Sequence, residues 1–207
     1  MKPDFNLYLI TDRKLFSSPG KMVTAIGEAL EGGARAVQLR EKDLGVRELL
    51  ELARQLRGMT KECGAHLFIN DRLDVALAAG ADGVHLGRES MPVQAARKAS
   101  EGSLMIGVSA HSVDEARKAG QDGADFITLG PVYETPSKLQ YGRPVGLEVL
   151  RESARRVSLP VFAVGGIRTG RVREVLQQGA FGIALISAIL GAEDVKKTTE
   201  DFMRELS

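Results

Sequence analysis

Short apolar runs alternate along the chain with longer segments in which apolar residues recur at helical spacing. Four of the runs share a small-residue break, an apolar stretch and a polar or glycine end: GGARAVQLR, AGADGVHLG, DGADFITLG and QGAFGIALIS. Four more lie between them: LYLIT, HLFIN, LMIGVS and PVFAVGG. Apolar runs of this length, bounded by glycine, are typical of strands buried on both faces. The sequence therefore predicts eight strands.

Helical patterns fill the gaps between these strands. MVTAIGEALEGG and VRELLELARQLRGMTKECG have apolar residues at helical spacing, and each ends at glycine. SVDEARKAG begins with Ser112 and has Glu115 three residues later, which is the pattern of a capping box. Strict alternation of strand and helix implies parallel strands joined by crossover helices. Eight such units predict an α/β fold, a single-domain (β/α)8 TIM barrel over residues 1–207, with an open doubly wound sheet as the alternative.

Composition and charge narrow the function classes. With 43% apolar residues, the chain of 207 residues can bury one sizeable core. A net charge of +1, 5% aromatic residues and the absence of tryptophan argue against a nucleic-acid partner. No apolar run approaches the roughly 20 residues that span a bilayer, and the N-terminus lacks a signal-peptide pattern. A single cysteine, Cys63, fits a reducing compartment, so we expect a cytoplasmic protein, with homo-oligomerisation left open.

The ends of the last two predicted strands suggest a phosphate site. In a (β/α)8 barrel the active site lies at the carboxyl ends of the strands, frequently with phosphate bound after strands seven and eight. Gly165 and Gly166 follow the seventh strand, and Ile186 and Ser187 follow the eighth. Glycine allows backbone N–H groups to approach an anion closely. The alternative is that the glycine pair only makes a tight turn.

Cations and hydroxyl groups follow the second and sixth strands. Gln38, Arg40 and Lys42 alternate through VQLREK, so Gln38 and Arg40 share one face of their strand. If that face is the barrel interior, an unpaired arginine there would be costly, and an anionic ligand would resolve the cost. The alternative is a solvated strand end with extended cations. The stretch GPVYETPSK adds two hydroxyl groups and an ammonium on a neighbouring loop, those of Thr135, Ser137 and Lys138.

Carboxylates after the third and fourth strands indicate a metal. Asn70 and Asp71 follow the third strand, and Glu89 follows the fourth. Mg²⁺ typically takes one or two carboxylates together with substrate phosphates and water, which Asp71 and Glu89 could supply. The alternative for Asp71 is an N-cap of the helix RLDVALAAG.

The three histidines give a weaker signal. His66 and His85 lie within predicted strands, where histidine is more often a satisfied core or edge residue. His111 follows Ser109 beyond the end of the fifth strand, which makes it the better functional candidate. No Ser-His-Asp order or metal-ligand spacing links the three.

Taken in order, ITDR, VQLREK, INDR, ADGVHLG, GVSAH, GPVYETPSK, AVGGI and LIS resemble thiamine-phosphate synthase, from about Leu7 to Ser187. Members of that family are phosphate-binding barrels. With Mg²⁺, they join 4-amino-2-methyl-5-pyrimidinylmethyl diphosphate to a thiazole phosphate, releasing thiamine phosphate and pyrophosphate. The resemblance implies that the pyrimidine diphosphate is held by Gln38, Arg40, Lys42, Asn70, Ser109 and Lys138. It also implies that the thiazole phosphate is held by Thr135, Ser137, Gly166, Ile186 and Ser187, and that Asp71 binds Mg²⁺.

We expect Lys138, Ser109 and Arg40 to be catalytic: Lys138 and Arg40, together with Lys42 and Mg²⁺ on Asp71, offset the charge of the departing pyrophosphate. Ser109 is expected to contact the pyrimidine or a diphosphate oxygen. One departure concerns the metal: the family usually has a second aspartate after the fourth strand, where this chain has Ser90, with Glu89 beside it. The sister thiazole tautomerase shares the barrel, but its bacterial form has a histidine where this chain has Pro131. A non-catalytic binder of thiazole or thiamine phosphate is the remaining alternative.

Overall fold

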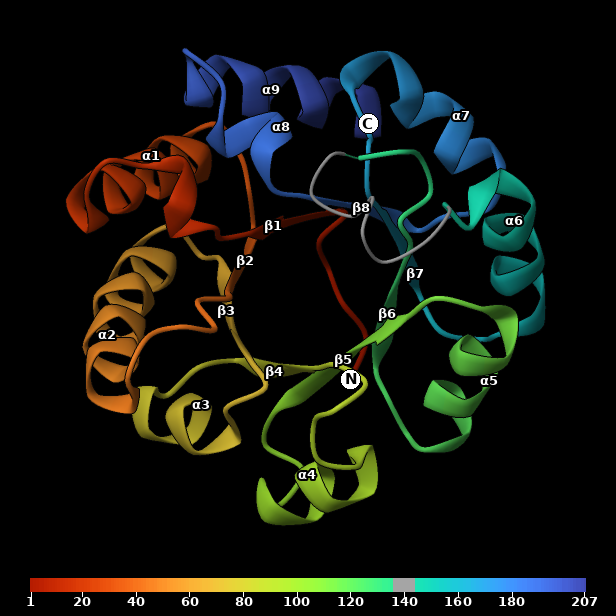
Figure 1. The fold of residues 1–207 in the computed structure, drawn as a ribbon, viewed down its shortest axis with the longest axis horizontal. Coiled ribbons are helices and arrows are strands. Elements are labelled where there is room, and N and C mark those ends of the chain that lie inside the picture. The colour runs from red at the N-terminus through yellow and green to blue at the C-terminus, as the bar shows by residue number, and fades with distance from the viewer. Residues whose placement is uncertain (136–143) are drawn as a thin grey trace.

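Eight parallel strands close into a barrel in chain order in the computed structural model, which describes residues 1–135 and 144–207 (Figure 1). The strands are β1 Leu7–Ile10, β2 Ala36–Leu39, β3 His66–Asn70, β4 Gly83–Leu86, β5 Met105–Ala110, β6 Phe126–Leu129, β7 Val161–Val164 and β8 Gly182–Leu185. Seven of the eight runs that the sequence singles out contain one of them, and LMIGVS covers β5 except for its last residue, Ala110. The (β/α)8 prediction is confirmed, and the open sheet is wrong because β1 also pairs with β8.

The helices form a ring around the barrel (Figure 1). They are α1 Pro19–Glu31, α2 Val46–Glu62, α3 Leu73–Ala79, α4 Val93–Ala99, α5 Val113–Gln121, α6 Gly146–Arg156, α7 Val172–Gln177, α8 Ser187–Leu190 and α9 Val195–Leu206, with short 3₁₀ helices η1 Arg13–Leu15 and η3 Thr169–Arg171. Among the described helices, none is both long enough and apolar enough to cross a bilayer.

Helix capping follows the sequence signals in α1 and only in part in α5. The Ser18 hydroxyl accepts from the backbone N–H of Lys21, with Pro19 as the first helical residue. In α5 the Ser112 hydroxyl accepts from the Glu115 N–H as predicted. The Glu115 carboxylate, however, accepts from the N–H of His111 at 2.7 Å, so the predicted reciprocal contact of the capping box is wrong.

Two apolar cores lie on the two sides of the sheet. The larger core fills the space between the strands and the helices. The smaller core fills the barrel interior, where the rings of Tyr8, Phe68, Phe126 and Phe162 pack largely edge to face. Phe5, in the segment before β1, is 4% exposed and contacts all four rings. The interior is therefore packed with side chains, and polar groups are left for the carboxyl ends of the strands.

Candidate active site at the carboxyl ends of the strands

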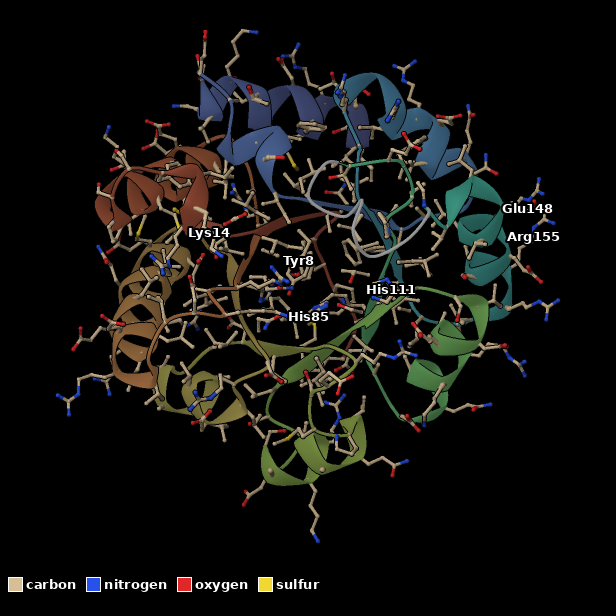
Figure 2. The ribbon with its side chains drawn as sticks, viewed as in Figure 1. Tyr8, Lys14, His85, His111, Glu148 and Arg155 are labelled. Carbon is tan, nitrogen blue, oxygen red and sulfur yellow. The ribbon has the colours of Figure 1, made fainter. Side chains whose placement is uncertain are left out.

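A chain of polar side chains crosses the barrel above the aromatic layer. The Gln38 amide donates to the Tyr8 hydroxyl at 3.1 Å, and that hydroxyl lies 3.4 Å from Nδ1 of His85. On the other side of the imidazole, Nε2 lies 3.0 Å from the hydroxyl oxygen of Ser109. Figure 2 shows Tyr8 and His85 near the centre of the barrel. These groups come from β1, β2, β4 and β5, so the closed sheet brings them together.

The imidazole and the phenol in this chain are both neutral. Burial, followed by the positive charge of Arg40, lowers the pKa of His85 to about 3. Burial raises the pKa of Tyr8 well above its ordinary value. The Tyr8 hydroxyl, which accepts from Gln38, then donates to Nδ1 of His85, and the Nε2–H donates to Ser109. The Thr128 hydroxyl donates to the Ser109 oxygen at 3.5 Å, so Ser109 is held by both His85 and Thr128.

Arg40 and Lys42 follow the end of β2. Gln38 is 1% exposed and lies inside the barrel, which confirms that this face of the strand points inward. Arg40 is half-buried, and its charge acts on His85. Within residues 1–135 and 144–207, neither the Arg40 nor the Lys42 side chain forms an ion pair, whereas nearby Arg13 pairs with Asp43 at 2.8 Å. Two unpaired cations beside the barrel interior suit an anionic ligand.

Asp71 stands at the end of β3 with an exposed carboxylate. Its backbone has φ +66°, a conformation in which aspartate is enriched among non-glycine residues, and its N–H donates to the carbonyl of His85 at 2.8 Å. Helix α3 has Arg72 as its N-cap, so the interpretation of Asp71 as the cap is wrong. Its carboxylate makes no hydrogen bond to any described residue. Asn70, the last residue of β3, pairs with His85 across the sheet.

The turn after β4 explains what Ser90 does. Its hydroxyl accepts from the backbone N–H of Gly87 at 2.7 Å, so it closes the turn. Glu89 is exposed beside it. The described residues contain no group of three or more histidine, cysteine or acidic side chains that could hold a metal. The assignment of Asp71 and Glu89 as Mg²⁺ ligands therefore stays a prediction, in which substrate phosphates and water would supply the remaining ligands.

The loops after β6 and β7 form one unit. The N–H of Val132 donates to the carbonyl of Val164 at 2.8 Å, and the N–H of Tyr133 donates to that of Gly165 at 3.1 Å. Gly166 has φ +67°, and a Cβ there would lie 2.7 Å from both the Glu134 carbonyl oxygen and Tyr133 Cβ. Only glycine therefore fits this close approach.

Arg171, the last residue of η3 and the N-cap of α7, connects these two loops. Its guanidinium donates to the Gly166 carbonyl at 2.8 Å and lies 4.2 Å from the centre of the Tyr133 ring. The Tyr133 hydroxyl donates to Glu174 at 2.5 Å. Burial and then this hydrogen bond raise the pKa of Tyr133 to about 12. Thr135 is half-buried and directly follows Glu134, whose carbonyl oxygen lies against Gly166.

Ile186 and Ser187 lie where β8 turns into α8. Ile186 packs against the core inside the barrel, as does Val164 at the end of β7. Ser187 is the first residue of α8 and is exposed. Because Val164 pairs with Ala184, the ends of β7 and β8 are neighbours, which places Gly166 and Ser187 on the same side of the barrel. Ser137 and Lys138 lie outside the described residues.

His66 and His85 both have the satisfied structural positions that the sequence suggests. His66 is the first residue of β3 and pairs with the exposed Asp4 at 2.8 Å. His111 donates from Nδ1 to the carbonyl of Gly130, which ties the end of β5 to the end of β6. His85 lies in the core, as expected. It also contacts Ser109, which is a candidate substrate-binding residue. The sequence did carry a signal for this contact, because His85 is a polar residue inside an apolar strand, as Gln38 is.

Comparison with known proteins identifies the family to which this barrel belongs. The family model described as thiamine monophosphate synthase matches residues 7–189. The chain belongs to the thiamine monophosphate synthase family. A protein of Geobacter sulfurreducens is 54% identical over 95% of this chain and 92% of its own length. Thiamine-phosphate synthase of Pyrococcus furiosus is 45% identical over 99% of this chain and 96% of its own length.

Solved structures agree with this assignment. Thiamine phosphate pyrophosphorylase from Pyrococcus furiosus has a TM-score of 0.89 and 45% identity, covering 98% of this chain and 95% of that one. That from Bacteroides thetaiotaomicron has a TM-score of 0.68 at 18% identity over 97% and 96%, which supports the fold alone. The predicted family and enzyme class, a transferase of thiamine biosynthesis, are confirmed. The comparisons do not favour the thiazole tautomerase or the non-catalytic binder.

Proposed function

We propose that this barrel joins 4-amino-2-methyl-5-pyrimidinylmethyl diphosphate to a thiazole phosphate, forming thiamine phosphate and releasing pyrophosphate. One arrangement carries the proposal: the unpaired cations Arg40 and Lys42 follow β2, while the glycine pair Gly165–Gly166 follows β7. A substrate pair that carries a diphosphate on one component and a phosphate on the other matches two separate anion sites around one ring of strand ends.

In the proposed reaction the carbon–oxygen bond to the diphosphate breaks first, and the bonding electrons leave with pyrophosphate. The electron-rich aminopyrimidine stabilises the resulting cation, and the thiazole nitrogen then forms the new carbon–nitrogen bond. Gln38 and Ser109 contact the pyrimidine diphosphate in this proposal. The neutral state of His85 supports it, because an imidazolium at that position would repel the cation.

Charge on the departing oxygens is offset by Arg40, Lys42 and Lys138 in the proposal. Asp71, with Glu89 as a second carboxylate and Asn70 beside it, would hold Mg²⁺, which when bound neutralises part of the diphosphate charge. Lys138→Ala should lower the rate by roughly 10²- to 10³-fold, the scale of losing one charge-stabilising donor.

The thiazole phosphate is assigned to the other side of the barrel. Backbone N–H groups near Gly166 and Ser187 would hold the phosphate, with Ile186 against the ring and the hydroxyls of Thr135 and Ser137 as further donors. The contribution of this site is positioning, because it keeps the thiazole nitrogen in line with the reacting carbon. The proposed partners are these small molecules, and the half-buried single Cys63 supports a cytoplasmic location.

The decisive experiment measures pyrophosphate release with each substrate alone and with both, in the presence and absence of Mg²⁺. We expect release that requires both substrates and Mg²⁺. Turnover of a thiazole substrate alone, without metal, would instead assign the tautomerase reaction, and binding without turnover would assign a sensor.

A Mg²⁺ titration tests the metal ligand. Asp71→Asn should raise the Mg²⁺ concentration needed for half-maximal rate. Asp74→Asn is the matched control, because Asp74 is exposed nearby and pairs with Arg72, so it should leave the titration unchanged. Identical titrations for wild type and Asp71→Asn would remove Asp71 from the site.

A further inference from the structure

Glu41 is a buried carboxylate that lies in sequence between Arg40 and Lys42, the two cations after β2 that form no ion pair with any described residue. Its side chain is only 3% exposed, although both neighbours in sequence, Arg40 and Lys42, are more accessible. A buried acidic group is costly unless it is well hydrogen-bonded. Alternation past the end of β2 explains the contrast, because residues 40 and 42 point to one side and residue 41 to the other. The question is what this carboxylate holds.

Both oxygens of Glu41 accept hydrogen bonds from the segment that follows β1. Oε1 accepts from the Thr11 hydroxyl at 2.6 Å and from the Arg13 N–H at 3.1 Å. Oε2 accepts from the same N–H at 3.2 Å, and the Arg13 guanidinium lies 3.9 Å away. Burial raises the pKa of Glu41 above its ordinary value, and the hydrogen bonds from Thr11 and Arg13 offset only part of that rise. The carboxylate thus fixes the ends of β1 and β2 to each other.

Thr11 passes this contact on to Arg40. Its side chain is fully buried, and its Oγ1, which donates to Glu41, accepts from the backbone N–H of Arg40 at 2.9 Å. The Thr11 N–H donates to the carbonyl of Gln38 at 2.9 Å, just beyond the last ladder pair, Ile10 with Gln38. Beyond the last main-chain hydrogen bond between these two segments, the Thr11 hydroxyl therefore provides the contact that fixes the backbone at Arg40.

We propose that Glu41 is a positioning residue: through the Thr11 hydroxyl it fixes the main chain at Arg40, so that Arg40 and Lys42 face the diphosphate. The inference rests on the diphosphate-binding role proposed above for these two cations. Glu41 itself points away from the ligand and touches neither substrate. By fixing the backbone from which the long, flexible side chains of Arg40 and Lys42 extend, Glu41 reduces the entropy that is lost when these side chains bind the anion.

Four variants test this role. Glu41→Gln removes the negative charge and replaces one acceptor oxygen by an N–H donor, Thr11→Val removes the hydroxyl, Thr11→Ser keeps it, and Asp43→Asn removes an exposed carboxylate that also pairs with Arg13. Binding of inorganic pyrophosphate by calorimetry and the KM for each substrate are the readouts. Glu41→Gln and Thr11→Val should weaken pyrophosphate binding and raise the KM for the pyrimidine diphosphate about tenfold, the scale of one charge-assisted hydrogen bond.

The KM for the thiazole phosphate should stay within about twofold in the same variants, and Thr11→Ser and Asp43→Asn should behave as wild type. A merely structural role predicts a lower melting temperature with both KM values unchanged or shifted together, and that result would overturn the inference. Arg40→Ala and Lys42→Ala distinguish the proposed role of the two cations from that of Glu41. If they leave pyrophosphate binding unchanged, the proposed role of the cations fails; if they alone weaken it, only the role of Glu41 fails.

Discussion

Nε2 of His85 lies 3.0 Å from the hydroxyl oxygen of Ser109, while Nδ1 of the same ring lies 3.4 Å from the Tyr8 hydroxyl. The imidazole therefore bridges β1 and β5 across the barrel interior. Because burial keeps it neutral, the ring can orient Ser109 but cannot supply a positive charge at neutral pH. The consequence is a polar site whose geometry depends on hydrogen bonds within the core.

Removing the Tyr8 hydroxyl should cost stability. Tyr8→Phe leaves the Gln38 amide and Nδ1 of His85 without their buried partner, so we expect the free energy of unfolding to fall by roughly 1–3 kcal/mol. Tyr133→Phe is the matched control, because its hydroxyl meets Glu174 at the surface and should cost under about 1 kcal/mol. Urea denaturation measures both. Equal losses would show that the Tyr8 contacts carry no special weight.

The pH dependence of stability should report the neutral His85. Its pKa is about 3 in the folded state, against an ordinary 6.5, so between these values the unfolded chain binds a proton that the folded chain does not. Stability from this residue is therefore present above pH 6.5 and falls by about 1.4 kcal/mol per pH unit as the pH drops toward 3. His85→Gln should show a shallower loss of unfolding free energy from pH 7 to pH 4.5. An unchanged slope would mean that the imidazole protonates in the folded state.

Gly107 should tolerate no side chain. A Cβ at this position in β5 would lie 2.4 Å from Phe126 Cζ and 2.6 Å from Nδ1 of His85. Gly107→Ala should lower the free energy of unfolding by about 1–3 kcal/mol and displace the imidazole, with loss of activity. Gly120→Ala in α5 meets only Leu159 at 3.6 Å and should be neutral or stabilising by about 0.5–1 kcal/mol. Chemical denaturation and the pyrophosphate assay compare the two, and a fully active Gly107→Ala would contradict the role of the His85 position.

Gly166 should be required for its space as well as for its backbone conformation. Gly166→Ala brings both left-handed strain and contacts of 2.7 Å with Glu134 and Tyr133, so we expect the KM for the thiazole phosphate to rise at least about tenfold. Gly146→Ala has comparable strain, at φ +79°, but its Cβ meets no described atom within 4 Å. Its KM should match wild type. Similar KM values for the two variants would place the phosphate elsewhere.

Local patterns were enough to predict the strands and the barrel. The inward position of Gln38 follows from alternation along an apolar strand, and the capping role of Ser112 follows from a four-residue motif. Asp71 could not be separated from a helix cap by sequence, because aspartate serves both purposes and only the backbone path shows that Arg72 takes the cap.

Local sequence patterns could not predict the contacts that cross the barrel. Tyr8 and His85 are 77 residues apart, and Thr11 and Glu41 are 30 apart, so each pair is set by strand register and closure. Glu115 fits the capping motif, yet its carboxylate accepts from the N–H of His111, because a flexible side chain can reach either of two adjacent backbone N–H groups. Ser137 and Lys138 belong to the part of the chain outside the described residues, so their roles stay predictions.

Phe5 and the rings above it also determine the route that ligands can take. The N-terminal segment, red in Figure 1, crosses the end of the barrel away from the viewer, and Phe5 packs there against four aromatic rings. These side chains close that end of the barrel. Substrates must therefore approach, and both products must depart, over the opposite end, where the strands finish.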